Sequence, residues 1–326
     1  MRFTFFVFMK RVTGMDWLKK GIASLDVNNP QYAVEIDEIL KIKPDVFNNF
    51  NEWTPLKLIL LNYTFYVCST IISKTSFFKH KYYVDFFAGS GINKLKGKQD
   101  LIIGSPLIVS RGNHSALYDE MIFCEKDPIL SEALSLRLNF LKKRNLTVIG
   151  REYESCLDEI MKKLNQRDTY SFLFIDPDCM EFKWEDMKKV LATRSDILFN
   201  FMTTEMWRCV GLANAGKSEG KKLIDMFGDE SWKKAKTEEE FVEIYKNKIL
   251  EERKDAPVKV IKVQSKKFHF YYHLFFVTNK TSGGNKWLRA IDKAKEEIEA
   301  NSDKAVMMAL DVVKKRQRDL SEFWNR

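Results

Sequence analysis

The feature that most constrains this chain is an alternation of short apolar runs with longer helical stretches, which begins near residue 82. Several runs are continuously apolar, which is typical of strands buried on both faces of a parallel sheet. Repeated β–α units of this kind build a doubly wound α/β sheet with right-handed crossovers. The expected strands are residues 82–87, 121–125, 146–149, 170–176 and 196–201.

The stretches that separate these strands predict helices, and a longer helix is expected to begin around Thr54 and Pro55. Near the end of the chain, β-rich runs at 258–263 and 270–278 are close enough to form an antiparallel hairpin at the sheet edge. The connection 92–119 predicts a long loop, and such loops inside a compact domain are usually functional or mobile. The expected helices between strands are residues 128–144, 155–165 and 184–192.

These patterns divide the chain into three parts. Residues 1–50 are weakly patterned and form an N-terminal extension. Residues 51–285 form the α/β domain, with a helical insertion near 214–253. Residues 286–326 are charged and helical, and we expect them to pack on the same domain.

The first expected strand ends in a glycine turn, Asp85-Phe86-Phe87-Ala88-Gly89-Ser90-Gly91. In an open α/β sheet, ligands bind beyond the carboxyl ends of the strands, and glycine lets the backbone approach them closely. Two common nucleotide motifs do not match. A Walker loop needs Gly-Lys-Ser/Thr after the turn, and a dinucleotide fingerprint needs a third glycine where Lys94 stands.

Acidic residues end two further strands of the predicted sheet. Glu125 closes the second strand, and its two carboxylate oxygens could accept both hydroxyl protons of a ribose. Asp176-Pro177 closes the fourth strand, so Asp176 should emerge at the same sheet edge as Gly89 and Gly91. The plainer alternatives are that Glu125 only begins a loop and that Asp176-Pro177 is a strand-ending turn.

These residues resemble a class I S-adenosylmethionine-dependent methyltransferase and, more narrowly, the three-Cys-motif partner protein (TcmP) family. The similarity covers about residues 52–300. It implies a Rossmann-like, mostly parallel seven-stranded sheet with a reversed last strand, an antiparallel terminal hairpin and helical additions. The segments that carry the resemblance are Tyr83–Gly91, Gly104–Leu107, Phe174–Pro177, Phe227–Trp232 and Tyr272–Asn279.

The resemblance also implies a cofactor, S-adenosylmethionine, and a set of residues to hold it. The methionine part would pass over Gly89 and Gly91, Glu125 would hold the ribose, and Tyr153 would lie near the adenine. The family name implies a partner that carries a three-cysteine motif, of a radical-SAM-like or phage type. The implied cofactor-binding residues are Asp85, Phe87, Ala88, Gly89, Ser90, Gly91, Glu125, Lys126 and Tyr153.

Asp176 and Pro177 are the expected catalytic residues. In amino-methyltransferases this motif is Asp/Asn-Pro-Pro followed by an aromatic residue, and it orients the target nitrogen toward the methyl group, which is positioning catalysis. Here Asp178 and Cys179 stand where the second proline and the aromatic residue would be, so Phe182 or Trp184 would have to supply the ring. Two functions remain open. One is a methyltransferase of unknown acceptor, and the other is a non-catalytic or regulatory partner of a three-cysteine protein.

Charge leaves the class of acceptor open. Lys and Arg number 54 against 45 Asp and Glu, which gives a net charge of +9. A basic balance suits nucleic acid, but an ordinary solubility surface gives the same number. Nucleic acid is therefore a candidate partner and substrate.

Cysteine usage and hydropathy predict a reduced, cytoplasmic protein. The five cysteines form no CxxC pair and the chain has 4 His, so we expect no metal site. The longest uncharged stretch, Leu58–Ser73, is shorter than a membrane span and carries polar residues, which favours a buried helix and no membrane contact. The apolar run at residues 3–9 has no cleavage site after it, so no signal peptide is expected.

Overall fold

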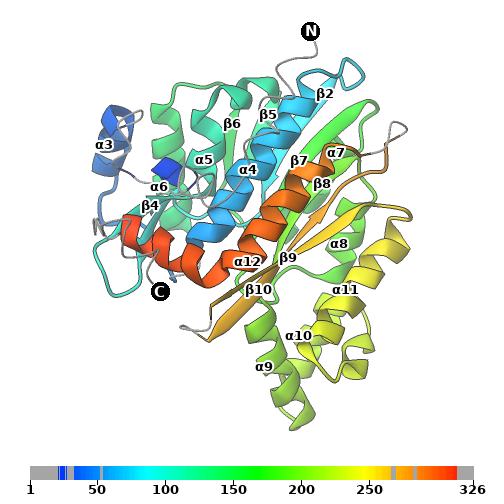
Figure 1. The fold of residues 1–326 in the computed structure, drawn as a ribbon. Helices are drawn as coiled ribbons and strands as arrows, with labels where there is room; N and C mark the ends of the chain where they lie inside the picture. Colours follow the sequence, from blue (N-terminus) through cyan, green and yellow to red (C-terminus); the bar gives the residue numbers. More distant parts are fainter. Residues whose placement is uncertain are drawn as a thin grey trace.

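A seven-stranded sheet forms the centre of the protein, with helices on both of its faces (Figure 1). The computed structural model describes residues 33–51, 54–265, 269–281 and 285–313, together with residues 21, 23–25 and 27. The strand order is β6-β5-β2-β7-β8-β10-β9. The strands are β2 (His80–Asp85), β5 (Glu120–Cys124), β6 (Leu146–Ile149), β7 (Thr169–Ile175), β8 (Ser195–Phe201), β9 (Val258–Ser265) and β10 (Phe270–Val277).

The strand directions confirm the expected Rossmann-like sheet. β6, β5, β2, β7 and β8 are parallel, whereas β10 is antiparallel to both β8 and β9. The last strand is therefore reversed, and the hairpin forms one edge of the sheet as expected. The chain runs outward from β2 through β5 to β6 and then returns to β7 on the other side of β2. This reversal of order is the place where open α/β sheets bind their ligands.

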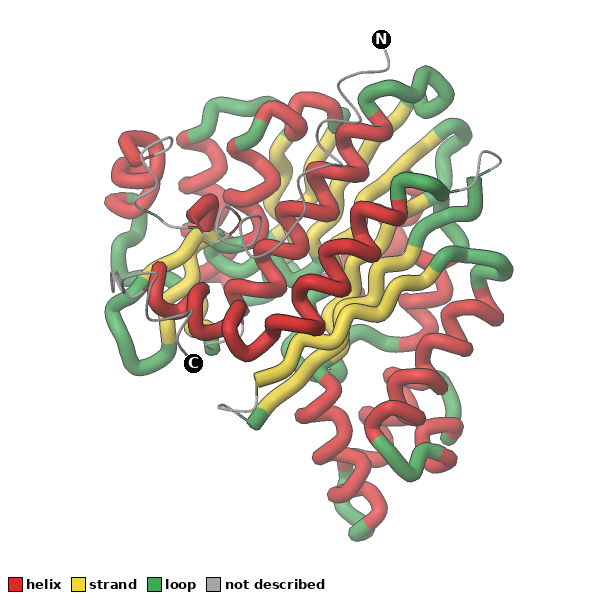
Figure 2. Tube along the Cα trace, viewed as in Figure 1, coloured by secondary structure: helices red, strands yellow, loops and turns green. Residues whose placement is uncertain are grey.

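Two layers of helices bury the two faces of the sheet, as Figure 2 shows. Alternate side chains of β2 point into opposite layers, with Tyr83 in one hydrophobic cluster and Val84 in the other. One layer contains α4 (Thr54–Ile72), α5 (Ser105–Arg111), α6 (Pro128–Phe140) and α12 (Leu288–Val313). The other contains α7 (Tyr153–Leu164), α8 (Trp184–Leu191), α9 (Thr203–Asn214), α10 (Glu219–Phe227) and α11 (Glu238–Glu252).

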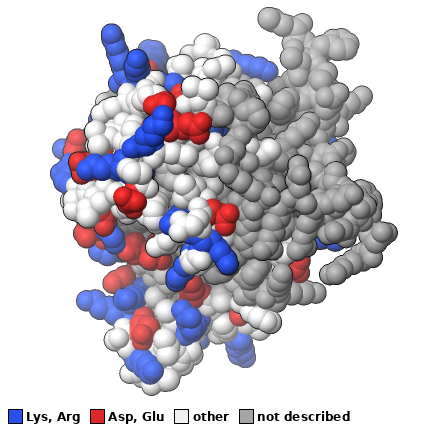
Figure 3. Space-filling view, turned by 90° about the vertical axis from the view of Figure 1, so that its left-hand side faces the viewer, with Lys and Arg blue, Asp and Glu red and all other residues white. Residues whose placement is uncertain are grey.

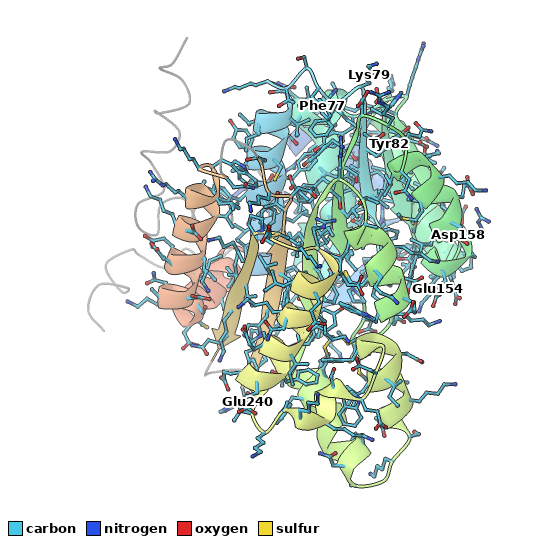
Figure 4. The ribbon with its side chains drawn as sticks, turned by 90° about the vertical axis from the view of Figure 1, so that its right-hand side faces the viewer. Phe77, Lys79, Tyr82, Glu154, Asp158 and Glu240 are labelled. Carbon is cyan, nitrogen blue, oxygen red and sulfur yellow. The ribbon has the colours of Figure 1, made fainter. Side chains whose placement is uncertain are left out.

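Ion pairs join α7 both to Lys183, which precedes α8, and to α8 itself. Glu154 lies 3.1 Å from Lys183, and Asp158 lies 3.1 Å from Lys189. Figure 4 shows Glu154 and Asp158 on the outer side of α7. Exposed pairs of this kind contribute little to stability, so the packing of buried residues such as Leu157 holds α7 on the sheet.

Helix α4 is the one helix, among the described residues, that is long and apolar enough to cross a membrane by length and composition. It has 19 residues and its best window has a mean hydropathy of 1.4. Most of that window is buried inside the protein, where α4 packs against α12, β7 and β8. A core helix of a globular domain passes the same test, and the predicted buried helix is found here.

The segment 92–119, which the sequence predicts as a long loop, is instead built from regular structure. It contains β3 (Ile92–Leu95), β4 (Leu101–Ile103), α5 and the 3-10 helix η1 (Asn113–Leu117). Ile102, Ile103 and Leu107 are completely buried. Each of these elements is too short for its hydrophobic period to be recognised in the sequence.

The segment before residue 50 also carries structure. It contains α3 (Ala33–Lys41) and β1 (Asn48–Phe50), and β1 pairs in parallel with β3 in a small three-stranded sheet. This pairing crosses the limit at residue 50 that the sequence predicts for the main domain. The expectation of no signal peptide concerns residues that lie outside the described part of the chain.

Candidate active site

Three acidic residues mark the carboxyl ends of three adjacent strands. Asp85 ends β2, Glu125 follows β5, and Asp176 follows β7. Because β2 pairs with both β5 and β7, the three ends lie side by side at the reversal of strand order. The charges of Asp176 and Glu125 both help to raise the pKa of Asp85, so the three groups are close enough to interact.

The turn after β2 requires glycine at two positions. Gly89 and Gly91 have φ values of 64° and 81°, which side chains with a Cβ atom rarely adopt. A Cβ atom on Gly89 would lie 2.5 Å from Oδ1 of Asn48, and one on Gly91 would lie 3.1 Å from Cδ1 of Leu134. The turn is therefore packed closely from both sides.

Glu125 is fixed in place by two backbone amides. Its Oε2 atom accepts a hydrogen bond from the N–H of Gly89 at 2.8 Å, and its Oε1 atom accepts one from the N–H of Asp127 at 2.8 Å. Each carboxylate oxygen has a second acceptor position. The geometry therefore leaves one acceptor on each oxygen, which suits the two hydroxyl groups of a vicinal diol.

Asp85 is completely buried and only partly satisfied. Its Oδ1 atom accepts a hydrogen bond from the N–H of Phe87 at 3.2 Å, whereas Oδ2 has no partner among the described residues. Burial raises the pKa of Asp85 to about 7, although the nearby Ser105 side chain and the N–H of Phe87 act to lower it. A buried acceptor without a partner is costly, so this site fits a proton or a donor group of a ligand.

Asp176 is held by a cation and an amide. Lys57 on α4 places its Nζ atom 2.7 Å from Oδ1 and 2.6 Å from Oδ2, and Nδ2 of Asn200 on β8 donates to Oδ1 at 2.7 Å. The side chains of Lys57 and Asp176 are only 13% and 17% exposed. The Oδ1 atom of Asn200 is buried and has no partner among the described residues. Pro177 is buried directly beside this group.

Sequence reasoning missed both Lys57 and Asn200. Each stands out in its segment, because Lys57 is the one charged residue within α4 and Asn200 is an amide within the apolar run 197–201 of β8. A polar group in an apolar segment has to be paired when it is buried. The segment alone does not reveal the partner.

The two aromatic residues that follow the Asp176 motif do not present a ring on which an acceptor could stack. Phe182 and Trp184 are both buried, with 1% and 5% of their surface exposed. The ring of Phe182 stacks on that of Tyr153 at 5.0 Å, and Trp184 begins α8. Neither ring replaces the missing aromatic residue of the amino-methyltransferase motif.

Tyr153 lies at the start of α7 in a small aromatic cluster. Its ring also contacts Phe87 at 5.3 Å, and its hydroxyl donates to the carbonyl of Glu181 at 3.0 Å. Burial raises the pKa of the Tyr153 hydroxyl above its ordinary range. Its predicted contact with adenine stays a prediction.

The remaining predicted cofactor residues divide into two groups. Ala88 and Ser90 belong to the turn, where the N–H of Ala88 donates to the carbonyl of Cys124 at 2.9 Å and the Ser90 hydroxyl donates to a neighbouring carbonyl at 2.9 Å. Lys126 is exposed and pairs with Glu181 at 2.6 Å. The structure thus brings the turn and Glu125 together, whereas the charged end of Lys126 is engaged with another segment.

Two of the five cysteines lie side by side although 32 positions separate them in the sequence. The Sγ atoms of Cys124 and Cys156 are 3.6 Å apart and buried, and all five cysteines are free thiols. Within the described ranges, no three His, Cys, Asp or Glu side chains form a group that could hold a metal ion.

Comparison with known proteins gives structural likeness only. No family model matches the sequence, and no curated protein sequence matches it. Trm1 from Pyrococcus horikoshii, solved with S-adenosyl-L-methionine, is 12% identical, with 82% of this chain and 77% of that chain covered and a TM-score of 0.44. An O-methyltransferase from Bacillus cereus, solved with SAH, is 8% identical, with 67% and 80% covered and a TM-score of 0.38.

Proposed function

We propose that this chain is an S-adenosylmethionine-dependent methyltransferase that resembles the three-Cys-motif partner family. The observation that carries the proposal is the convergence of the Gly89–Gly91 turn, Glu125 and Asp176 at adjacent strand ends. The sheet order, with its reversed last strand, supports the same proposal.

The residues present fit the chemical groups of this cofactor. The open acceptor positions of Glu125 suit the ribose hydroxyls, and the unpartnered Oδ2 atom of Asp85 suits the amino group of the methionine part. Gly89 and Gly91 keep the turn free of side chains, and the group that covers Gly89 is the polar amide of Asn48. When bound, the cofactor would supply an electrophilic methyl group on a sulfonium.

Asp176 is the proposed positioning group for the methyl acceptor. Lys57 and Asn200 together occupy both acceptor positions of Oδ1 and one of Oδ2. One acceptor position on Oδ2 is left for an N–H or O–H group. Holding that group in a single direction is the main contribution that a side chain of this kind can make.

Nucleic acid is the acceptor class to test first, because a net charge of +9 is compatible with it. On the face drawn in Figure 3, Lys and Arg are interspersed with Asp and Glu among the described residues. Contacts with phosphates release counterions, so nucleic-acid binding should weaken steeply as salt rises. A flat dependence of log affinity on log salt would exclude this class.

Calorimetric titration with S-adenosylhomocysteine tests the proposed cofactor site. We expect saturable binding to the wild-type protein and a loss of about tenfold or more in Glu125→Gln, because one oxygen then becomes an amide nitrogen that cannot accept a hydrogen bond. Asp127→Asn is the matched control, since the exposed side chain of Asp127 caps α6 and the variant keeps the backbone N–H that donates to Glu125. Equal affinity of Glu125→Gln and wild type would remove Glu125 from the site.

A second function is favoured by the ion pair at Asp176. Because Lys57 already engages both carboxylate oxygens, the chain could act as a non-catalytic partner or regulatory subunit of a three-cysteine protein. In that case the two proteins would co-purify, and labelled S-adenosylmethionine would transfer no methyl group to nucleic acid or protein. Transfer of a methyl group by the isolated chain would support the methyltransferase and exclude the non-catalytic partner.

A further inference from the structure

The segment before the predicted domain places one side chain directly on the glycine turn. Asn48 on β1 accepts a hydrogen bond from the N–H of Ser90 through its Oδ1 atom at 2.6 Å. A Cβ atom built on Gly89 would lie 2.5 Å from Oδ1 and 2.9 Å from Nδ2 of Asn48. The whole amide group of Asn48 therefore covers the Cα face of Gly89.

A buried arginine fixes this arrangement. Arg137 on α6 is 1% exposed and donates to the carbonyl of Ser90 at 2.8 Å. The same guanidinium donates to the carbonyls of Lys43 at 2.9 Å and Val46 at 2.7 Å, in the segment that leads into β1. Arg137 thus holds the glycine turn and the segment before Asn48 together, which limits the freedom of the Asn48 side chain.

The amide nitrogen of Asn48 is an available donor. Its oxygen is used by Ser90, and no described residue accepts a hydrogen bond from Nδ2, which carries two protons. Two ionisable side chains at the turn, Asp85 and Glu125, are acidic, and the guanidinium of Arg137 is already engaged by backbone carbonyls. A ligand carboxylate at the turn would meet these two acids, so it needs a free N–H donor, and the amide of Asn48 offers one.

We propose that Asn48 binds the carboxylate of the cofactor's amino-acid part through its Nδ2 protons, with Arg137 as the positioning residue. This inference rests on the proposed cofactor. The amino group and the carboxylate of that part would then be divided between Asp85 and Asn48. The N-terminal segment that contains Asn48 would then form part of the cofactor site, and it would not be an extension outside the domain.

Two ligands that differ in the amino-acid part test this assignment by calorimetry. S-adenosylhomocysteine has the carboxylate, and 5′-methylthioadenosine has the same adenosyl group without it. Asn48→Asp keeps an oxygen for the N–H of Ser90 but replaces the donor by a second anionic oxygen. We expect it to weaken S-adenosylhomocysteine by about tenfold or more, and Asn48→Ala to weaken it less. Methylthioadenosine should bind both variants within about twofold of wild type.

Asn49→Ala is the matched control, because Asn49 is the exposed neighbour on the same strand. Unchanged S-adenosylhomocysteine binding in Asn48→Asp would overturn the assignment. An equal loss for both ligands would also overturn it, since Asn48 would then act only through the shape of the turn. Failure of both ligands to bind the wild-type protein would overturn the proposed cofactor itself, and with it this inference.

Discussion

The Nζ atom of Lys57 lies 2.6 Å from Oδ2 of Asp176, although 119 positions separate the two residues in the sequence. Lys57 stands in the first turn of α4, which precedes the whole sheet, and Asp176 follows the fourth strand of the parallel series. The pair forms because α4 packs against β7 and β8. It orients the carboxylate on which the proposed acceptor site depends.

Replacing Lys57 by Met should destabilise the protein by about 1 to 3 kcal/mol, because the mostly buried carboxylate of Asp176 then loses its cationic partner. Urea unfolding measures this cost, and methyl transfer should fall in the same variant. Lys79→Met is the control, since Lys79 is 74% exposed and lies 3.9 Å from its acidic neighbour. It should change stability by less than about 1 kcal/mol. Equal stabilities of the two variants would contradict the account.

Asp85 should make the stability of the protein depend on pH. Burial raises its pKa from 3.8 to about 7, so between these values the folded protein holds a proton that the unfolded chain has lost. Its contribution to stability is therefore complete below pH 3.8 and is lost as the pH rises through about 7. Between about pH 5 and 8, the free energy of unfolding of the wild type should therefore fall by about 2 kcal/mol more than that of Asp85→Asn, which cannot ionise at this position. The measurement is urea unfolding at both pH values.

The exposed Asp45→Asn variant serves as the control for the pH experiment, and its unfolding curve should follow the wild type. Parallel pH profiles of Asp85→Asn and wild type would show that Asp85 ionises normally in the folded protein.

Gly89→Ala and Gly97→Ala should differ although both glycines have positive φ values, 64° and 71°. Each substitution costs about 1 kcal/mol in backbone strain. A Cβ atom at Gly97 meets no atom within 4 Å, whereas one at Gly89 meets Asn48 at 2.5 Å. Thermal unfolding should therefore show a larger loss for Gly89→Ala, and only that variant should lose cofactor affinity. Equal losses in both properties would mean that Asn48 does not lie over the turn.

Arg137→Gln should destabilise the protein by about 3 kcal/mol, because a shorter side chain cannot reach all the carbonyls that the guanidinium now joins. Limited proteolysis should cut the variant faster within residues 42–50, the segment that loses its attachment. Arg144→Gln, at an exposed position, is the control. If Arg137→Gln resists the protease as well as the wild type does, contacts other than those of Arg137 hold this segment.

The main sheet could be predicted from the sequence because its strands are apolar on both faces and its turns carry glycine or acidic residues. The predicted strand 82–87 is displaced from β2 by about two residues, since Phe86 and Phe87 continue the apolar run into the turn. The small sheet escaped prediction because β1 and β4 have only 3 residues each. Such short runs show no measurable period.

The candidate site could be predicted only where residues stand directly at strand ends. The Asp85–Gly91 turn, Glu125 and Asp176 are of this kind, and the fold brings their strands together. Lys57 and Asn48 reach the site from α4 and β1, so their roles depend on tertiary packing that no local pattern encodes.

A crystal structure of the protein with S-adenosylhomocysteine is the measurement that tests the central claim most directly. The account predicts the ribose hydroxyls within hydrogen-bond distance of Glu125 and the amino-acid part above Gly89. A ligand bound at any other place, with Glu125 bonded only to Gly89 and Asp127 as it is here, would contradict the proposed site.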